Sequence, residues 1–87
     1  MQIIKRSGKV VDFDISKVKT SIETSASDIN LSLTSSDMNI LLDDFNKNLI
    51  KLRKEDGITS AYEVRGLIYD VLTKHSFNNI CKSYMNF

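Results

Sequence analysis

Basic side chains gather in one short segment near the N-terminus of this 87-residue chain. Lys5, Arg6 and Lys9 flank a serine and a glycine, and Asp14 and Lys17 follow soon after. Lysine and arginine at the end of a strand, with backbone N–H groups nearby, have the chemistry to bind phosphate. Lys17 would lie in the first turn of a helix, where the helix dipole also favours an anion. A solvated charged turn followed by a helix cap is the more common structure for this spacing, so the residues alone leave both alternatives open.

The other reactive side chains form no recognisable catalytic pattern. His75 has no serine or cysteine partner at a spacing typical of nucleophilic catalysis, so we interpret it as an ordinary surface or helix-end histidine. Cys81 falls on an apolar stripe and should be a small buried side chain. Phe77 and Tyr84 should belong to the core, although the hydroxyl of Tyr84 could reach a ligand. The acidic residues near the longest predicted helix should only solvate it; they are Asp37, Asp43, Asp44 and Glu55.

The composition excludes several classes of protein. Lys and Arg number 12 against 11 Asp and Glu, and this net charge of +1 argues against a strongly basic nucleic-acid-binding surface. The longest apolar run has three residues, Ile40-Leu41-Leu42, which is too short for a membrane span or a signal peptide. A single cysteine and a single histidine exclude an internal disulfide and most metal sites built from those residues. No glycine-rich phosphate loop of either common type is present, so nucleotide binding would need another architecture. The residues alone predict one small cytoplasmic binding or regulatory domain over residues 1–87, with no catalytic or metal-binding residues.

Two short runs of β-branched and aromatic residues predict a β-hairpin over about residues 2–13. Gly8 lies between the runs, where it can adopt a positive φ without strain. Because two strands alone are marginally stable in water, the hairpin must pack on other elements.

Apolar residues at three- and four-residue spacing predict four helices, over about 15–27, 35–54, 60–74 and 77–86. The predicted fold class is therefore α+β and mostly α, with a short N-terminal hairpin as a lid over a four-helix bundle. The predicted inward-facing residues are Ile15, Val18, Ile22 and Ala26 in the first helix, Met38, Leu41, Leu42, Phe45, Leu49 and Leu52 in the second, Val64, Leu67, Ile68, Val71 and Leu72 in the third, and Phe77, Ile80, Cys81 and Tyr84 in the fourth.

Polar residues mark the ends of these helices. Asp14 is the predicted N-cap of the first helix, and Ser35-Ser36 the predicted cap of the second. Asp56-Gly57 should end the second helix. Ser60 and Glu63 have the spacing of a capping box, in which hydroxyl and carboxylate each accept a backbone N–H, at the start of the third helix.

The order of these motifs resembles the ATP-cone family of small regulatory nucleotide-binding domains. Residues 3–18, IIKRSGKVVDFDISKV, are similar to the family's opening of Lys-Arg-x-Gly followed by Phe-Asp and a lysine. Residues 58–64, ITSAYEV, resemble the start of its third helix, and residues 77–87, FNNICKSYMNF, resemble its aromatic last helix. ATP-cones occur in many ribonucleotide reductases and in the bacterial repressor of their genes, and the resemblance implies a hairpin lid over four helices.

The resemblance also implies a ligand and the residues that bind it. ATP or dATP would be bound as an allosteric effector without hydrolysis, and Mg²⁺ would accompany the phosphates. The implied binding residues are Lys5, Arg6 and Lys17 at the phosphates, Asp14 at the ligand or a lysine, Ile4, Val11, Val18 and Val64 around the adenine, and Thr59, Ser60 and Tyr84 at the edge of the site.

The resemblance leaves the partner of the domain open. The nucleotide would act on ribonucleotide reductase or on its transcriptional control, with a reductase or another chain contacted in trans, and a homo-oligomer stays open. The alternative function is a protein-interaction module that keeps the fold and no longer binds nucleotide. Binding to a membrane or to nucleic acid is not expected.

Overall fold

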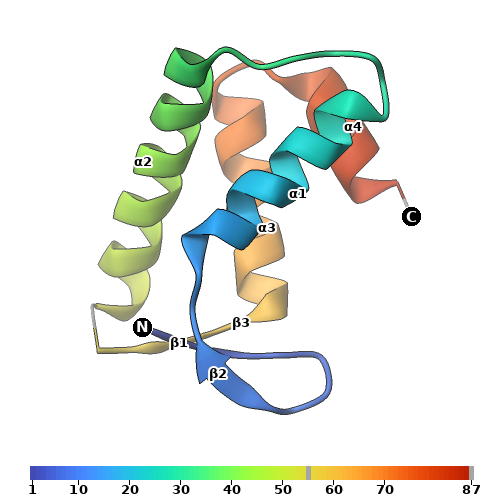
Figure 1. Cartoon of the computed structure of the whole chain (residues 1–87). Coiled ribbons are helices and arrows are strands. Elements are labelled where there is room, and N and C mark those ends of the chain that lie inside the picture. Colours follow the sequence, from blue (N-terminus) through green and yellow to red (C-terminus); the bar gives the residue numbers. More distant parts are fainter. Residues whose placement is uncertain (55, 87) are drawn as a thin grey trace.

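A three-stranded sheet lies at one end of four helices in the computed structural model of the chain, which describes residues 1–54 and 56–86 (Figure 1). Glu55 and Phe87, which belong to the sequence patterns above, lie outside the described residues. The elements in chain order are β1 (Gln2–Ile4), β2 (Val10–Asp12), α1 (Ile15–Ser27), α2 (Ser35–Arg53), β3 (Ile58–Ser60), α3 (Ala61–Lys74) and α4 (Asn78–Met85). The structure thus confirms the predicted α+β, mostly helical class.

The hairpin forms at the N-terminus because Gly8 allows the turn. β1 and β2 are antiparallel, with Ile3 opposite Val11. Gly8 has a φ of 88°, a conformation that costs a residue with a Cβ more than it costs glycine. The backbone N–H of Lys5 donates to the carbonyl oxygen of Lys9 at 2.9 Å and closes the loop.

A third strand, which the sequence analysis missed, pairs with the hairpin. β3 runs parallel to β1, with Ile3 opposite Thr59, so the strand order is β2-β1-β3. Its three residues are too few for an alternating pattern, and the last of them also caps α3. This third strand supplies part of the support that an isolated hairpin lacks.

Two of the predicted caps are present. Asp14 Oδ1 accepts the backbone N–H of Ser16 at 3.0 Å at the start of α1. Ser60 Oγ accepts the backbone N–H of Glu63 at 3.1 Å at the start of α3. These bonds satisfy donors that the first turn of a helix leaves without an intrahelical partner.

The bounds of α2 lie within one residue of the prediction, but the residues predicted to cap and end the helix are wrong. Thr34, rather than Ser35-Ser36, is the N-cap, and its Oγ1 accepts the backbone N–H of Asp37 at 3.0 Å. The helix ends at Arg53, before Asp56-Gly57, because Lys54 adopts a φ of 60° that breaks the helical geometry. In this case a non-glycine residue has the positive φ with which helices often end.

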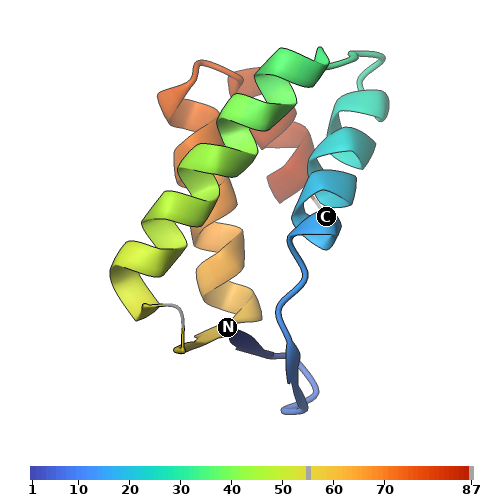
Figure 2. The ribbon, with the colours of Figure 1, turned by 60° about the vertical axis from the view of Figure 1, so that its left-hand side comes forward.

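The four helices share one core. Figure 2 shows all four on the same side of the small sheet. Helix α2 packs against α3, and α4 packs against both α1 and α3. The buried apolar side chains are Val18, Ile22, Ala26, Met38, Leu41, Phe45, Leu49, Leu67, Ile68, Val71, Leu72, Ile80 and Cys81. Ile15, Leu42, Val64, Phe77 and Tyr84 are partly buried against this core. Leu52, in the last turn of α2, is a correction: it is 59% exposed rather than directed into the core.

Candidate functional site

A small, mostly apolar cavity lies between the hairpin and helices α1, α3 and α4. Its volume is about 140 Å³. The residues that line it are Ile3, Lys5, Val11, Phe13, Asp14, Lys17, Val18, Ser21, Val64, Ile68 and Tyr84. The structure therefore brings together most of the residues predicted from the sequence, namely Lys5, Val11, Asp14, Lys17, Val18, Val64 and Tyr84.

The hairpin contributes alternate residues to the cavity, because neighbouring side chains on a strand point to opposite faces. Ile3 and Val11 are opposite one another in the register, and both line the cavity. Ile4 lies one position further along, is 40% exposed and is not among the lining residues. Ile3 therefore takes the wall position that the sequence analysis assigned to Ile4, a correction of one strand position.

Helix α1 presents its first two turns to the cavity. Lys17, Val18 and Ser21 follow Asp14 at helical spacing, so the four residues share one face. The Asp14 carboxylate accepts a hydrogen bond from the hydroxyl of Ser16 at 2.7 Å and another from the backbone N–H of Ser16. These two hydrogen bonds lower the pKa of the Asp14 carboxyl. Asp14 is thus an ionised acceptor at neutral pH and the only carboxylate among the described lining residues.

Helices α3 and α4 close the other side of the cavity. Val64 and Ile68 come from α3, and Tyr84 comes from α4. Burial raises the pKa of the Tyr84 hydroxyl, and the positive charges of Arg65 and Arg6 act in the opposite direction. The guanidinium carbon of Arg65 lies 5.6 Å from the centroid of the Tyr84 ring.

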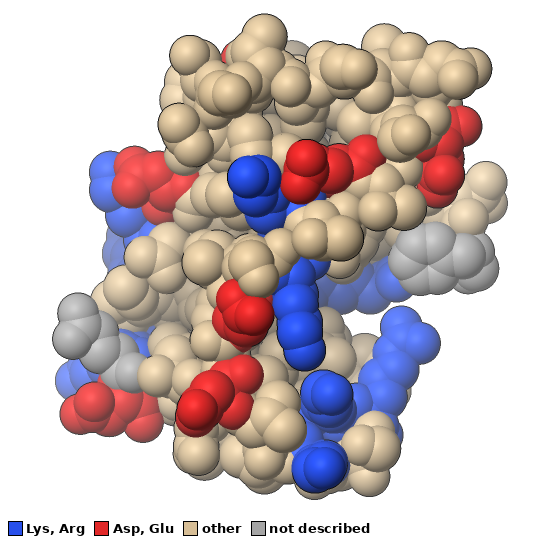
Figure 3. Space-filling model, in the orientation of Figure 1, with Lys and Arg blue, Asp and Glu red and all other residues tan. Residues whose placement is uncertain are grey.

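Two cationic side chains line this cavity, and two more act on a residue that lines it. Lys5 and Lys17 line it, and Arg6 and Arg65 act electrostatically on the Tyr84 that borders it. Figure 3 shows Lys and Arg side chains grouped on the hairpin and on the helical surface beside it, around a hollow in the surface. Since the whole chain has a net charge of only +1, the positive charge is a local feature of this site.

Two predicted site residues, Thr59 and Ser60, are not among the lining residues of the cavity. The Thr59 side chain is buried, and its hydroxyl donates to Glu63 Oε1 at 2.8 Å. Ser60 Oγ accepts the backbone N–H of Glu63. Both hydroxyls therefore have partners at the start of α3, and their place at the edge of the ligand stays a prediction. Arg6 also does not line the cavity, although its charge acts on Tyr84.

The Glu63 carboxylate has a different role from the one that the capping-box spacing predicted. Arg53 donates to it from Nε at 2.9 Å and from Nη2 at 2.8 Å, and Thr59 donates as well. The Arg53 hydrogen bonds are the main reason why the pKa of Glu63 is lowered. Only the Ser60 half of the predicted capping box is thus present, and the carboxylate joins α2, β3 and α3.

Asp44 also does more than solvate α2. Its Oδ2 lies 2.9 Å from His75 Nε2 and 3.2 Å from Lys74 Nζ, so it joins the middle of α2 to the end of α3. The hydrogen bond with His75 is the main cause of the lowered pKa of Asp44. The sequence analysis missed this contact because His75 and Asp44 lie far apart in the chain.

The sequence analysis also missed four residues that line the cavity: Ile3, Phe13, Ser21 and Ile68. The register of the hairpin relative to the core would have identified Ile3 and Phe13, since both lie on the inward face. Phe13 also stacks on the core ring of Phe45, with centroids 6.1 Å apart. Ser21 continues the face of Lys17 and Val18, but a serine there has no distinctive signal.

The prediction for Cys81 is confirmed, since the side chain is buried and its burial raises the pKa of the thiol. Within the described parts of the chain, no group of three or more His, Cys, Asp or Glu side chains gathers as a metal site would require.

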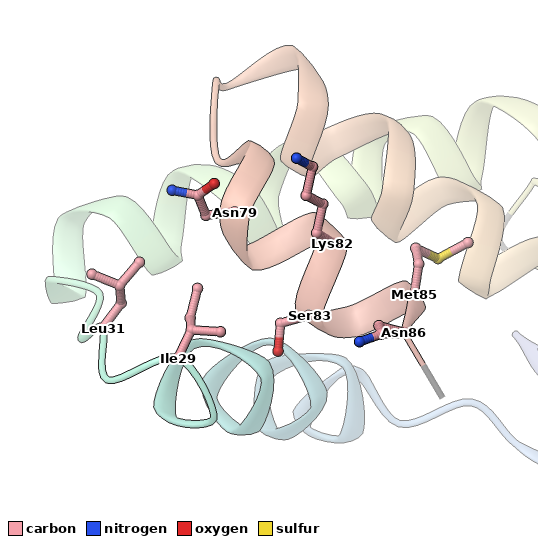
Figure 4. Close-up of a pocket in the computed structure, with 7 residues that line it drawn as sticks. All are labelled: Ile29, Leu31, Asn79, Lys82, Ser83, Met85 and Asn86. Carbon is pink, nitrogen blue, oxygen red and sulfur yellow. The ribbon is translucent and has the colours of Figure 1, made fainter.

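A larger hollow, of about 790 Å³, lies between α4 and the loop that follows α1 (Figure 4). Leu31, Ile29 and Met85 give it an apolar surface, and Lys82 is the one charged side chain among the lining residues that the structure describes. It therefore lacks the concentration of cations that distinguishes the cavity under the hairpin.

Comparison with known proteins identifies the family to which this fold and cavity belong. Among the residues that the structure describes, no helix has the combined length and apolarity that crossing a bilayer requires. A comparison with curated proteins gave no match. The family model described as "ATP cone domain" matches residues 1–87. ATP-cones are regulatory, non-catalytic domains that bind ATP or dATP. The match covers the whole chain and agrees with the hairpin and the four helices, and the chain therefore belongs to the ATP-cone family.

Proposed function

We propose that this domain binds ATP or dATP in the cavity under the hairpin, as an effector that is not hydrolysed. The observation that carries the proposal is the combination of an apolar cavity with cationic side chains around it. A purine base needs a dry apolar slot with few polar groups, and a triphosphate needs lysine and arginine.

The cavity has the size for a base rather than for a whole nucleotide. Its volume of about 140 Å³ is below the roughly 300–1,000 Å³ of sites that enclose a drug-sized ligand. The base would lie between Val11 and Ile3 of the hairpin and Val18 and Val64 of the helices. The ribose and the phosphates would then extend past the rim, where the cations lie.

Asp14 supports a preference for adenine over guanine. An ionised carboxylate accepts hydrogen bonds and cannot donate them. The exocyclic amino group of adenine is a donor, whereas guanine has a carbonyl oxygen at the corresponding position. A guanine carbonyl facing Asp14 would bring two acceptors together with no proton between them, whereas the adenine amino group would donate to the carboxylate.

Lys5, Arg6 and Lys17 would bind the phosphates, because they come from the hairpin and the first turn of α1 on the same side of the molecule as the cavity. Mg²⁺ would be held mainly by phosphate oxygens and water, as is common for this ion. None of these residues would activate a water molecule, so the nucleotide would act by shifting an equilibrium between states. We further propose that this equilibrium controls a ribonucleotide reductase or the transcription of its genes, in the cytoplasm.

Titration calorimetry of the chain with ATP, dATP, GTP and tripolyphosphate tests the proposal. We expect saturable binding of ATP or dATP, weaker binding of GTP, and no phosphate release from MgATP over hours. Equal binding of all four ligands would mean that only charge is recognised. Absence of binding would favour the protein-interaction module, with the fold retained and the effector site lost.

A further inference from the structure

The hollow between α4 and the loop after α1 is an open groove that runs along α4. Its volume of about 790 Å³ lies within the roughly 300–1,000 Å³ of ligand-binding sites in general. In Figure 4, Leu31 and Asn79 lie toward one end of the groove, and Met85 and Asn86 lie toward the other. The side chains of Leu31 and Met85 are 46% and 36% exposed, so each end of the groove presents apolar surface to solvent.

The polar side chains of the groove are left without partners by the described part of the chain. Lys82 forms no ion pair with a described acidic residue, and no Asp or Glu is among the described residues that line the groove. The side-chain amides of Asn79 and Asn86 form no hydrogen bond with another described residue. An amide has both donors and acceptors, so the two asparagines can bind the N–H and C=O groups of another backbone.

The spacing along α4 fits an extended segment of chain. Asn79 and Asn86 are seven residues apart, which is about 10 Å along a helix. Three residues of an extended chain cover about the same distance, and its alternate side chains point to the same side about 7 Å apart. Apolar side chains at the first and fifth positions of such a segment would contact Leu31 and Met85, with the third position beside Lys82.

We propose that this groove binds an extended segment of a partner protein that carries an acidic side chain between two apolar ones at alternate positions. The charges are complementary, because Lys82 is the one charged side chain among the described residues of the groove. Burial of the exposed apolar surface would supply most of the affinity, and the ion pair would supply mainly selectivity.

This inference goes beyond the proposed function and does not depend on it. None of the described residues that line the groove also lines the cavity under the hairpin. The two sites nevertheless share α4, since Tyr84 lines the cavity and its neighbour Ser83 lines the groove. A partner on α4 would therefore contact the same helix as the effector.

The test is a titration of the isotope-labelled chain with three five-residue peptides, followed by NMR. The peptides have blocked ends, and their sequences are Leu-Ala-Glu-Ala-Leu, Leu-Ala-Lys-Ala-Leu and Ser-Ala-Glu-Ala-Ser. We expect the first peptide to shift the amide signals of residues 29–31 and 78–86. It should bind about two- to fivefold more tightly than the lysine peptide, the usual effect of one exposed ion pair. The serine peptide should bind at least about fivefold more weakly than the first, because it buries no leucine.

Two variants of the chain test the two parts of the groove. Lys82→Glu should reverse the charge preference, so that the lysine peptide binds more tightly than the glutamate peptide. Leu31→Ala should weaken the binding of both leucine peptides about equally. Both positions are exposed, so the amide signals away from the groove should not change. The matched controls are Lys51→Glu and Ile40→Ala, at exposed positions of α2 outside the groove.

Three results would overturn the inference. One is the absence of peptide-dependent shifts in the groove at millimolar peptide. Another is equal binding of the glutamate and lysine peptides, or a charge preference that Lys82→Glu leaves unchanged. The third is a shift of the same signals with protein concentration alone, since the occupant would then be a second copy of this chain. Absence of ATP binding, in contrast, would contradict the proposed function alone.

Discussion

Arg53 and Glu63 form a two-pronged ion pair that joins the last turn of α2 to the first turn of α3, with Nη2 2.8 Å from Oε2. The Glu63 side chain is only 20% exposed, and the hydroxyl of Thr59 donates a further hydrogen bond to the same carboxylate. We expect this pair to stabilise the folded state more than a fully exposed pair does, because Glu63 is largely removed from water and accepts several hydrogen bonds in a fixed geometry.

We expect Glu63→Gln to lower the free energy of unfolding by about 1–3 kcal/mol at pH 7. The pKa of Glu63 is lowered in the folded state, so its contribution is present above the ordinary glutamate pKa of about 4.3. That contribution to stability is lost as the pH falls from the ordinary glutamate pKa through the lower pKa that Glu63 has in the folded state. Urea unfolding at pH 7 and near pH 3 should show a mutational effect that shrinks with acidification.

Asp43→Asn is the control for this measurement. Asp43 pairs with Lys47 one turn away on α2, and both side chains are largely exposed, at 67% and 73%. Its removal should change the free energy of unfolding by about 0.5 kcal/mol or less. A pH-independent effect of Glu63→Gln would contradict the role of the ion pair.

Asp44→Asn should lower the free energy of unfolding by about 1 kcal/mol, because Asp44 accepts from both His75 and Lys74. Asp44 and Glu63 connect the same two helices at different levels and share no partner. Their effects should therefore add in the double variant to within about 0.5 kcal/mol. A coupling clearly larger than this, measured by urea unfolding, would show that the two contacts depend on each other.

Lys5→Ala and Lys17→Ala should each weaken ATP binding about ten- to a hundredfold, the usual effect of losing one charge-assisted contact. Both residues line the cavity, and both are exposed, so the helical circular dichroism should not change. Calorimetry provides the affinity, and Lys51→Ala on α2 controls for the change in net charge. If both variants bind ATP with wild-type affinity, Lys5 and Lys17 do not bind the phosphates.

Asp14→Asn should reduce the preference for ATP over GTP. Asparagine is as good an N-cap as aspartate, so α1 should keep its cap. Its amide can also donate a hydrogen bond, which lets it pair with the carbonyl of guanine. The ratio of the two affinities, from parallel titrations, should fall by about tenfold. An unchanged ratio would mean that Asp14 only caps the helix.

Gly57→Ala should disturb the sheet, because a Cβ there would lie 1.9 Å from the carbonyl oxygen of Arg53. The carbonyl oxygen of Gly57 accepts the backbone N–H of Gln2 at 3.1 Å, so any shift is transmitted to β1. We expect a loss of about 1–3 kcal/mol in thermal or urea unfolding. The control is Gly66→Ala in α3, where a Cβ meets no atom within 4 Å, and helix propensity should then raise stability by about 1 kcal/mol. Equal effects at the two glycines would contradict this account.

The helices could be predicted from the sequence to within a residue or two, because each has an apolar stripe and most have a clear cap. The strand Ile58–Ser60 could not, since three residues carry no periodic signal and pairing with β1 is a long-range contact. Whether Ile3 or Ile4 lines the cavity depends on which face of the strand meets the core. Two adjacent isoleucines are equally apolar, so the sequence does not show which of them points inward.

The candidate site was predictable where the residues are close in sequence, and less so where the fold brings them together. Lys5, Asp14 and Lys17 share one short segment whose pattern is specific. Thr59 looked like a ligand contact because nothing in the sequence shows that Glu63 takes its hydroxyl. The sequence analysis assigned no role to Arg65, since its position beside Tyr84 depends on how α3 packs on α4.

The first strand of the chain is the central strand of the sheet, and this has a consequence for synthesis. β2 follows β1 at once, whereas β3 arrives only after α1 and α2 have been made. Closing so long a loop costs chain entropy, and such non-local pairing slows folding. The cavity also needs Tyr84, close to the end of the described chain. A nascent chain on the ribosome would therefore be unable to sense nucleotide until almost all of this domain has emerged.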